Sequence, residues 1–182
     1  MLRKYFKKIF TCNSGFTLAE LLVSIFIIAL ISGLFMVNYH NTNKRSELNV
    51  EKQKLASNIR LAQNYSLGSK TYDGVNTPKG GWGVHFDLAE PTKYVIFADQ
   101  ETPNGNQIYE ADEKIETKNL PAGITISSLS PANQVDIVFF PPDPVTYVNT
   151  LSTASAQITI KENINNSTAV ITVNSFGLID TE

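Results

Sequence analysis

This chain of 182 residues contains few cysteines and histidines, and its C-terminal two thirds contain no arginine. The single cysteine, Cys12, excludes a disulfide bond within the chain. The two histidines, His40 and His85, are too few for a histidine-based metal centre. No arginine follows Arg60, and the formal net charge of −2 argues against nucleic-acid binding. A hydrophobic content of 42% with 18% charged residues excludes a disordered chain and a polytopic membrane protein.

Charge, proline and glycine divide the chain into three parts. Residues 1–15 contain four basic and no acidic residues, residues 16–70 contain six basic and three acidic, and residues 71–182 contain five basic and fourteen acidic. All eight prolines lie in the last part, whereas residues 17–66 contain a single glycine. A stretch almost free of proline and glycine can stay helical throughout. A stretch that proline and glycine interrupt every few residues suits strands joined by turns. The sequence therefore predicts an α+β protein.

The expected helix changes character near residue 37. Residues 16–37 are almost entirely apolar. At 1.5 Å per residue they span about 33 Å, which matches the ~30 Å hydrocarbon layer of a membrane. Residues 38–70 are amphipathic, with one apolar stripe at helical spacing formed by Leu48, Leu55, Ile59 and Ala62. We expect this stripe to pack on the protein's own sheet rather than in a partner's groove.

Residues 71–182 read as a β-rich globular head. Alternating apolar residues rich in Val, Ile, Phe, Tyr and Thr predict six strands, at residues 82–88, 93–98, 124–127, 135–140, 157–161 and 169–174. No helical pattern separates these strands, so we expect one or two antiparallel sheets. The polar stretch at residues 146–157 is expected to be an exposed hairpin connection.

The basic residues before the apolar run favour a cytoplasmic N-terminus, with the acidic head across the membrane. A secretory signal would need a small-x-small cleavage site after the run, and residues 35–40 offer none. A lipoprotein signal would place its cysteine after the run, but Cys12 precedes it. We therefore expect a single-pass membrane protein.

Glu20 lies inside the apolar run, where an unpaired carboxylate costs several kcal/mol. One explanation is its position at the helix start, where the helix dipole tolerates a negative charge. The other is a partner cation, yet no lysine or arginine occurs between Lys8 and Lys44. Such a cation would come from another molecule or from a new N-terminus made by cleavage.

Residues 14–22, SGFTLAELL, follow a short basic leader and open the apolar run, and they resemble the type IV prepilin processing motif. The resemblance implies a leader of residues 1–15, cleavage after Gly15 by a membrane-embedded prepilin peptidase, and methylation of the new N-terminus at Phe16. It also implies that Glu20 neutralises the terminal amine of a neighbouring subunit, which supplies the missing cation.

Later segments are similar to the minor pilins and type II secretion pseudopilins of the FimT and GspH type, at residues 55–63, 81–84, 94–99 and 173–177. Some of these proteins bind DNA through a C-terminal arginine cluster, which this chain lacks, so we expect no nucleic-acid binding. The implied fold is pilin-like, with a long helix packed on an antiparallel head.

The resemblance implies a structural subunit of a type IV pilus, competence or type II secretion filament, without enzyme activity. Its partners would be other pilin or pseudopilin subunits and an inner-membrane assembly platform. The chain would sit in the inner membrane with its head periplasmic or extracellular, and then in a filament. The alternative is a tip-located minor pilin that acts as an adhesive or substrate-binding module.

Oxygen-bearing side chains gather after the second expected strand, and calcium prefers such ligands. They are Asp99, Glu101, Asn104, Asn106, Glu110 and Asp112. The segment has the length of an EF-hand loop, but Pro103 occupies a ligand position and the glycine comes one place late. We favour a solvated acidic loop and keep an irregular calcium site as the alternative; no other cofactor is expected.

Two further features carry no catalytic chemistry. His85 alternates with apolar neighbours, so we expect it to face solvent or a polar edge. Residues 80–83, GGWG, lack the Lys-Ser/Thr of a phosphate loop and are expected to turn the chain and give Trp82 room to pack. No serine sits in a nucleophile elbow.

Overall fold

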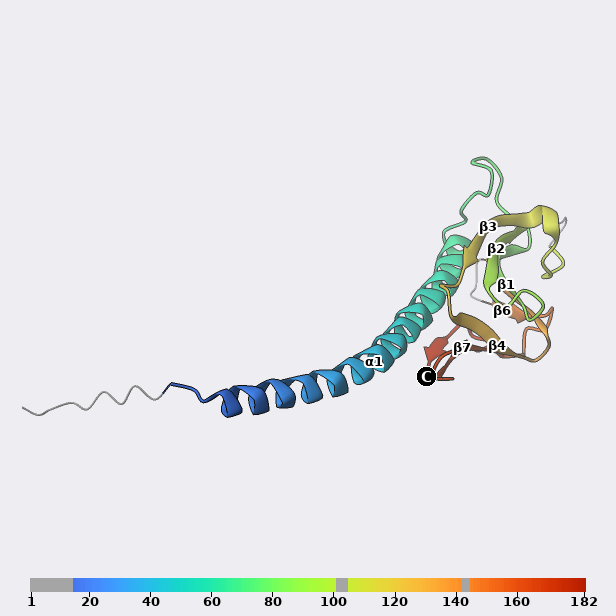
Figure 1. Cartoon of the computed structure of the whole chain (residues 1–182). Coiled ribbons are helices and arrows are strands. Elements are labelled where there is room, and N and C mark those ends of the chain that lie inside the picture. Colours follow the sequence, from blue (N-terminus) through green and yellow to red (C-terminus); the bar gives the residue numbers. More distant parts are fainter. Residues whose placement is uncertain (1–14, 101–104, 142–144) are drawn as a thin grey trace, which may run out of the picture. The chain divides into compact units, whose positions relative to one another are not determined.

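The computed structural model describes residues 15–100, 105–141 and 145–182, without the side chains of residues 37–42. It divides into two compact units, Met1–His40 and Asn41–Glu182. A single helix, α1 (Leu18–Leu67), contributes residues to both units (Figure 1). The predicted long helix is therefore confirmed.

Helix α1 ends three residues earlier than expected, and backbone hydrogen bonds explain why. Ser69 adopts a left-handed conformation, with φ of 48°. Its N–H donates to the Ser66 carbonyl, and the N–H of Lys70 donates to the Tyr65 carbonyl. These two bonds form a Schellman motif, which satisfies the last carbonyls of the helix and stops it at Leu67.

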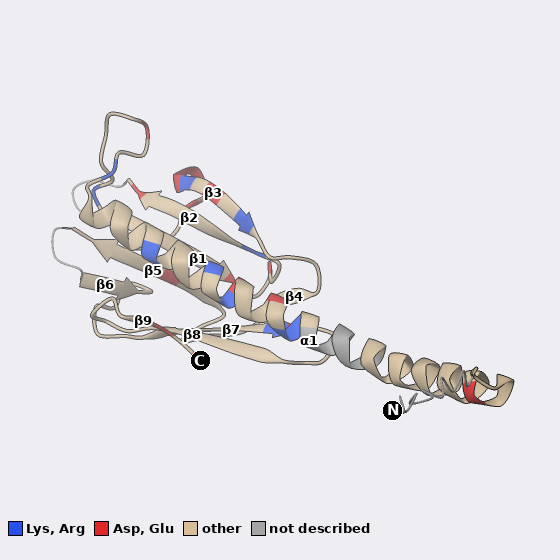
Figure 2. Cartoon of the chain, turned by 90° about the vertical axis from the view of Figure 1, so that its left-hand side faces the viewer, with Lys and Arg blue, Asp and Glu red and all other residues tan. Residues whose placement is uncertain are grey.

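The first unit consists of the apolar part of α1. Residues Leu18–Met36 are long and apolar enough to cross a membrane, and none of these side chains is buried within the chain. Glu20 is the one charged residue among them. Figure 2 shows the rest of this segment in the colour of uncharged residues. This surface needs lipid or other helices to cover it, as expected for a membrane-anchored pilin-like chain.

Nine strands occur in the described part of the second unit, and all paired strands are antiparallel. One sheet has the order β3-β2-β1-β5-β6 and the other β4-β7-β8-β9. Their bounds are β1 (Gly81–Asp87), β2 (Lys93–Asp99), β3 (Lys114–Asn119), β4 (Ile124–Ser130), β5 (Gln134–Phe140), β6 (Val145–Val148), β7 (Ala156–Glu162), β8 (Thr168–Val173) and β9 (Ile179–Thr181). The structure confirms the six predicted strands and the α+β class.

Strands β3, β6 and β9 were not predicted. Strand β6 also corrects the expected hairpin connection at residues 146–157, because it pairs with β5 and fully buries Thr146. A strand of four residues behind a proline cluster has too little alternation to stand out in the sequence.

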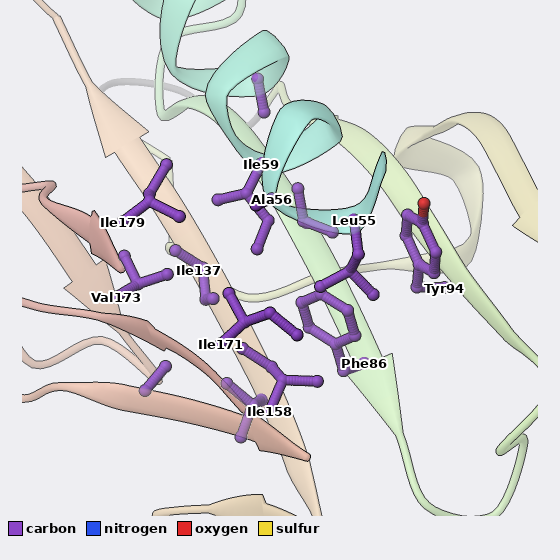
Figure 3. Packing of buried hydrophobic residues seen from close by; sticks show 14 of the residues in the cluster. Leu55, Ala56, Ile59, Phe86, Tyr94, Ile137, Ile158, Ile171, Val173 and Ile179 are labelled. Carbon is purple, nitrogen blue, oxygen red and sulfur yellow. The ribbon is translucent and has the colours of Figure 1, made fainter. Parts of the chain in front are cut away.

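The second part of α1 lies across the sheets (Figure 2) and shares one hydrophobic core with both of them. Leu48 is 3% exposed, and Leu55, Ile59 and Ala62 are fully buried, so the predicted packing of the stripe is confirmed. Figure 3 shows Leu55 beside Phe86 of the first sheet, with residues of the second sheet below. Burying each such leucine or isoleucine contributes about 1.5–3 kcal/mol.

Candidate functional site

The segment around the predicted cleavage position forms the start of α1. Thr17 precedes the first helical residue, and its hydroxyl accepts a hydrogen bond from the Glu20 N–H at 3.2 Å. In return, the Thr17 N–H donates to Glu20 Oε2 at 3.0 Å, and the Thr17 hydroxyl donates to the same oxygen at 2.9 Å. These reciprocal bonds form a capping box, which satisfies two amide groups that a helix start leaves open.

Gly15 and Phe16 lie outside this capped helix. Phe16 is 83% exposed, and a Cβ atom added at Gly15 would meet no atom within 4 Å. The peptide bond between them is therefore accessible, and nothing in the described chain requires glycine there. A break at this bond would leave the Thr17–Glu20 capping box intact and put a new amine next to Thr17.

Residues 11–36 match the family model described as the prokaryotic N-terminal methylation motif. The match contains Gly15, Phe16 and Glu20 and continues through the apolar part of α1. It marks a type IV prepilin-like protein. Comparisons with curated proteins and with solved structures gave no match.

Three of the six side chains of the candidate calcium loop, Asp99, Asn106 and Glu110, form hydrogen bonds within the chain. Glu101 and Asn104 lie outside the described residues. Asp99 is buried at the end of β2 and accepts from the Gln107 N–H at 2.7 Å. Asn106 donates to Glu110 at 3.1 Å, and Asp112 is exposed in a short 3₁₀ helix (Ala111–Glu113). Among the described residues, no group of three or more His, Cys, Asp or Glu is placed to hold a metal ion.

Glu113, the last acidic residue of this segment, was expected among solvated oxygen-bearing side chains, but the structure buries it. It is 3% exposed, and its two oxygens accept from the N–H groups of Gln100 at 2.8 Å and Glu110 at 3.2 Å. Burial raises the pKa of Glu113 to about 7, although these two hydrogen bonds lower it. The nearby negative charges of Asp99 and Glu110 raise it further.

This shift predicts a pH-dependent stability difference between the wild type and Glu113→Gln. The raised pKa means that the folded state favours the neutral acid, so Glu113 stabilises most below pH 4.5, its ordinary pKa. That contribution is lost as the pH rises through about 7. Urea denaturation should show the variant gaining stability relative to the wild type as the pH is raised across this window.

The control for this experiment is Glu116→Gln, because Glu116 lies on the exposed strand β3. Its stability difference from the wild type should stay constant over the same pH window. A constant difference for Glu113→Gln would contradict the buried-acid assignment.

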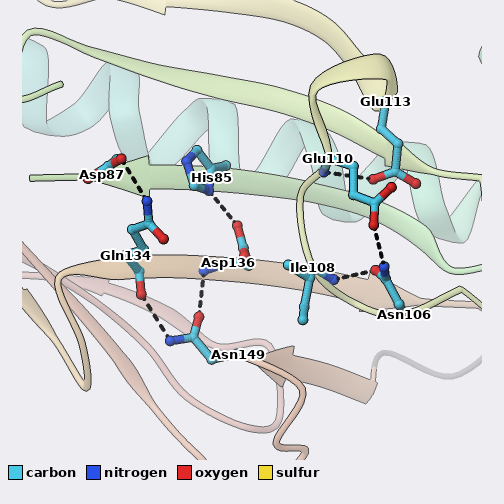
Figure 4. Close-up of polar contacts among 9 residues, drawn as sticks. All are labelled: His85, Asp87, Asn106, Ile108, Glu110, Glu113, Gln134, Asp136 and Asn149. Carbon is cyan, nitrogen blue, oxygen red and sulfur yellow. Dashed lines mark hydrogen bonds and ion pairs between the residues drawn. The ribbon is translucent and has the colours of Figure 1, made fainter. Parts of the chain in front are cut away.

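His85 was expected to face solvent or a polar edge, and the structure corrects the first part of this expectation. His85 pairs with Asp136 across β1 and β5, and its Nδ1 lies 2.6 Å from Asp136 Oδ1 (Figure 4). The ring of Tyr109 covers it at a centroid distance of 4.5 Å. Residues 105–113 therefore fold back over this face of the first sheet, which we call the outer face, as opposed to the face that packs on α1.

Within the GGWG segment, the predicted packing of Trp82 is confirmed. Trp82 is buried, its Nε1 donates to the Lys70 carbonyl at 3.0 Å, and its ring packs edge-on against Tyr65 at 5.0 Å. Gly83 makes room for a different ring, since an added Cβ would lie 2.6 Å from Phe97. The segment thus fixes the junction between α1 and the first sheet.

Proposed function

We propose that this chain is a structural subunit of a type IV pilus-like, type II secretion or competence filament, processed by prepilin peptidase after Gly15 and assembled through α1. One observation carries the proposal: the methylation motif at residues 11–36 includes an apolar helical segment, Leu18–Met36, with no buried side chain. Such a segment suits two environments in turn, the lipid bilayer before assembly and a bundle of helices afterwards.

The apolar segment accounts for both stages. In the membrane, its backbone groups are satisfied within the helix and its side chains contact lipid. In a filament, other subunits replace the lipid, and burial of apolar surface at about 25 cal/mol per Å² favours the bundle over exposure to water. The head shares one core with the second part of α1, and this unit remains folded throughout. Assembly then needs no chemistry from this chain.

Glu20 would determine how the helices of neighbouring subunits align during assembly. Its capping bonds come from neutral donors on Thr17 and leave the carboxylate charge uncompensated. In a helix bundle that excludes water, a buried charge requires a partner of opposite sign. The amine released at Phe16 by cleavage is such a partner, and the amine of a neighbouring subunit would fix the register between the two helices.

Before assembly, the chain would be a single-pass protein of the inner membrane with its head periplasmic or extracellular. Its partners would be prepilin peptidase, other pilin or pseudopilin subunits and the inner-membrane assembly platform.

Gly15→Val tests the processing step. Because a Cβ at this position meets none of the described residues, the fold should tolerate valine, and any effect reports the peptidase. Mass spectrometry of membrane fractions should find the wild type beginning at a methylated Phe16 and the variant retaining residues 1–15. Normal cleavage of the variant, or a wild type that keeps its leader, would contradict the proposal.

A further inference from the structure

A hollow of about 740 Å³ opens beside the outer face of the first sheet. It forms where the β1–β2, β4–β5 and β6–β7 turns meet, with one side chain from residues 105–113. Its lining residues are Asp87, Leu88, Ala89, Ile108, Ala132, Asn133, Gln134, Asp136, Asn149 and Thr150. The volume falls in the range of about 300–1,000 Å³ that is usual for ligand sites.

The polar side chains of this outer-face hollow hold one another in place (Figure 4). Asp87 accepts from the Ala89 N–H and from the Gln134 side chain, each at 2.8 Å. Asn149 bridges two residues of β5, since it donates to the Gln134 carbonyl at 2.9 Å and accepts from the Asp136 N–H at 2.8 Å. The polar groups are therefore positioned before any ligand arrives, which lowers the entropy cost of binding.

Charge and apolar surface in the hollow select a particular ligand chemistry. Two carboxylates, Asp87 and Asp136, belong to the lining, and none of the described lining residues is lysine or arginine. The hydrogen bonds from Ala89 and Gln134 hold the pKa of Asp87 below its usual value, so this carboxylate is ionised at neutral pH. The rest of the described lining is aliphatic or amide apart from the hydroxyl of Thr150, and it contains no aromatic ring on which a sugar would stack.

The backbone of one wall is also unusual. Asn149 and Thr150 both have positive φ, 47° and 72°, and a β-branched residue adopts this conformation at a cost. Val148 and Leu151 exchange two backbone hydrogen bonds across Asn149 and Thr150, so the positive φ values are those of a two-residue hairpin turn. This turn carries Asn149 into the polar network.

We propose that the outer-face hollow binds a lysine side chain presented by an exposed polypeptide segment of a partner. Its ammonium group would meet the carboxylate of Asp87, beside Asp136, whose Oδ1 already pairs with His85 Nδ1. Its methylene stem would lie along Leu88, Ile108 and Ala132. A charged tip on an aliphatic stem is the form of side chain that matches this wall. The proposal gives the head a peptide-binding role and does not depend on the filament proposal.

The test uses the full chain in detergent micelles and two matched probes. Nα-acetyl-lysine methylamide carries the ammonium group, and Nα-acetyl-norleucine methylamide has the aliphatic stem without it. Calorimetric titration should detect millimolar binding of the lysine probe that weakens as salt is added. Equal binding of the norleucine probe, or no binding of the lysine probe, would overturn the proposal. Binding of glucosamine alone would overturn the choice of a peptide ligand.

Two isosteric variants then locate the site. Asp87→Asn removes one charge and can keep both hydrogen bonds if the Gln134 amide rotates, and it should weaken lysine-probe binding about tenfold. Asp73→Asn is the matched control, because Asp73 is an exposed carboxylate that caps the Val75 and Asn76 N–H groups in another loop. Its affinity for the probe should not change. Equal affinities for the two variants would place the probe elsewhere and overturn the assignment.

Discussion

Replacing Glu20 by glutamine should give a chain that is processed normally but enters filaments poorly. Glutamine also forms capping boxes, so the bonds with Thr17 survive and only the negative charge is lost. If that charge pairs with the amine of a neighbouring subunit in a water-free bundle, its loss costs on the order of 3 kcal/mol, or about 100-fold in incorporation. Immunoblots of sheared filaments against membrane fractions would measure the ratio.

Thr17→Val is the control that separates pairing from helix capping. It removes the hydroxyl that caps the Glu20 N–H but leaves the carboxylate charge in place. Loss of a cap costs about 1 kcal/mol of helix stability, which an embedded helix tolerates, so incorporation should change little. Equal defects in Thr17→Val and Glu20→Gln would assign Glu20 a capping role alone, and normal assembly of Glu20→Gln would rule out charge pairing.

The sequence predicted those parts of the molecule whose signals are local. Helix α1 follows from a long stretch with one glycine and no proline, and its buried face follows from the spacing of Leu48, Leu55 and Ile59. The processing motif is linear and could be found without the fold. Six strands alternate apolar and polar residues strongly enough to be recognised. Strand β3 (Lys114–Asn119) is an edge strand of mostly polar residues, so its sequence shows no strand pattern, and it is a strand because it pairs with β2.

The outer-face hollow could not be predicted in this way. Its polar network joins Asp87, Gln134 and Asn149, which come from three turns or strand ends separated by 47 and 15 residues. Only the pairing of β1 with β5 and of β5 with β6 brings them together. Glu113 is a similar case, because nothing near it in the sequence indicates that residues 105–113 fold back and bury it.

Gly81→Ala should be among the most destabilising single changes in the head. Gly81 has a φ of 98°, and a Cβ atom there would lie 2.1 Å from the Phe139 carbonyl oxygen. That oxygen belongs to β5 and accepts from the buried Ser66 hydroxyl, so it cannot move without disturbing α1. Strain at positive φ and a backbone clash each cost about 1–3 kcal/mol, and together about 3–5 kcal/mol is expected.

Gly74→Ala isolates the backbone contribution to this loss. Gly74 has a similar φ of 87°, but an added Cβ would meet no atom within 4 Å, so its substitution should cost only about 1 kcal/mol. Urea denaturation of the full chain in detergent, followed by the fluorescence of its one tryptophan, Trp82, measures both variants. Similar midpoints for the two would mean that β1 shifts freely against β5 and that the GGWG segment does not fix the junction with α1. A much lower midpoint for Gly81→Ala would show that this junction requires a residue without a side chain at position 81.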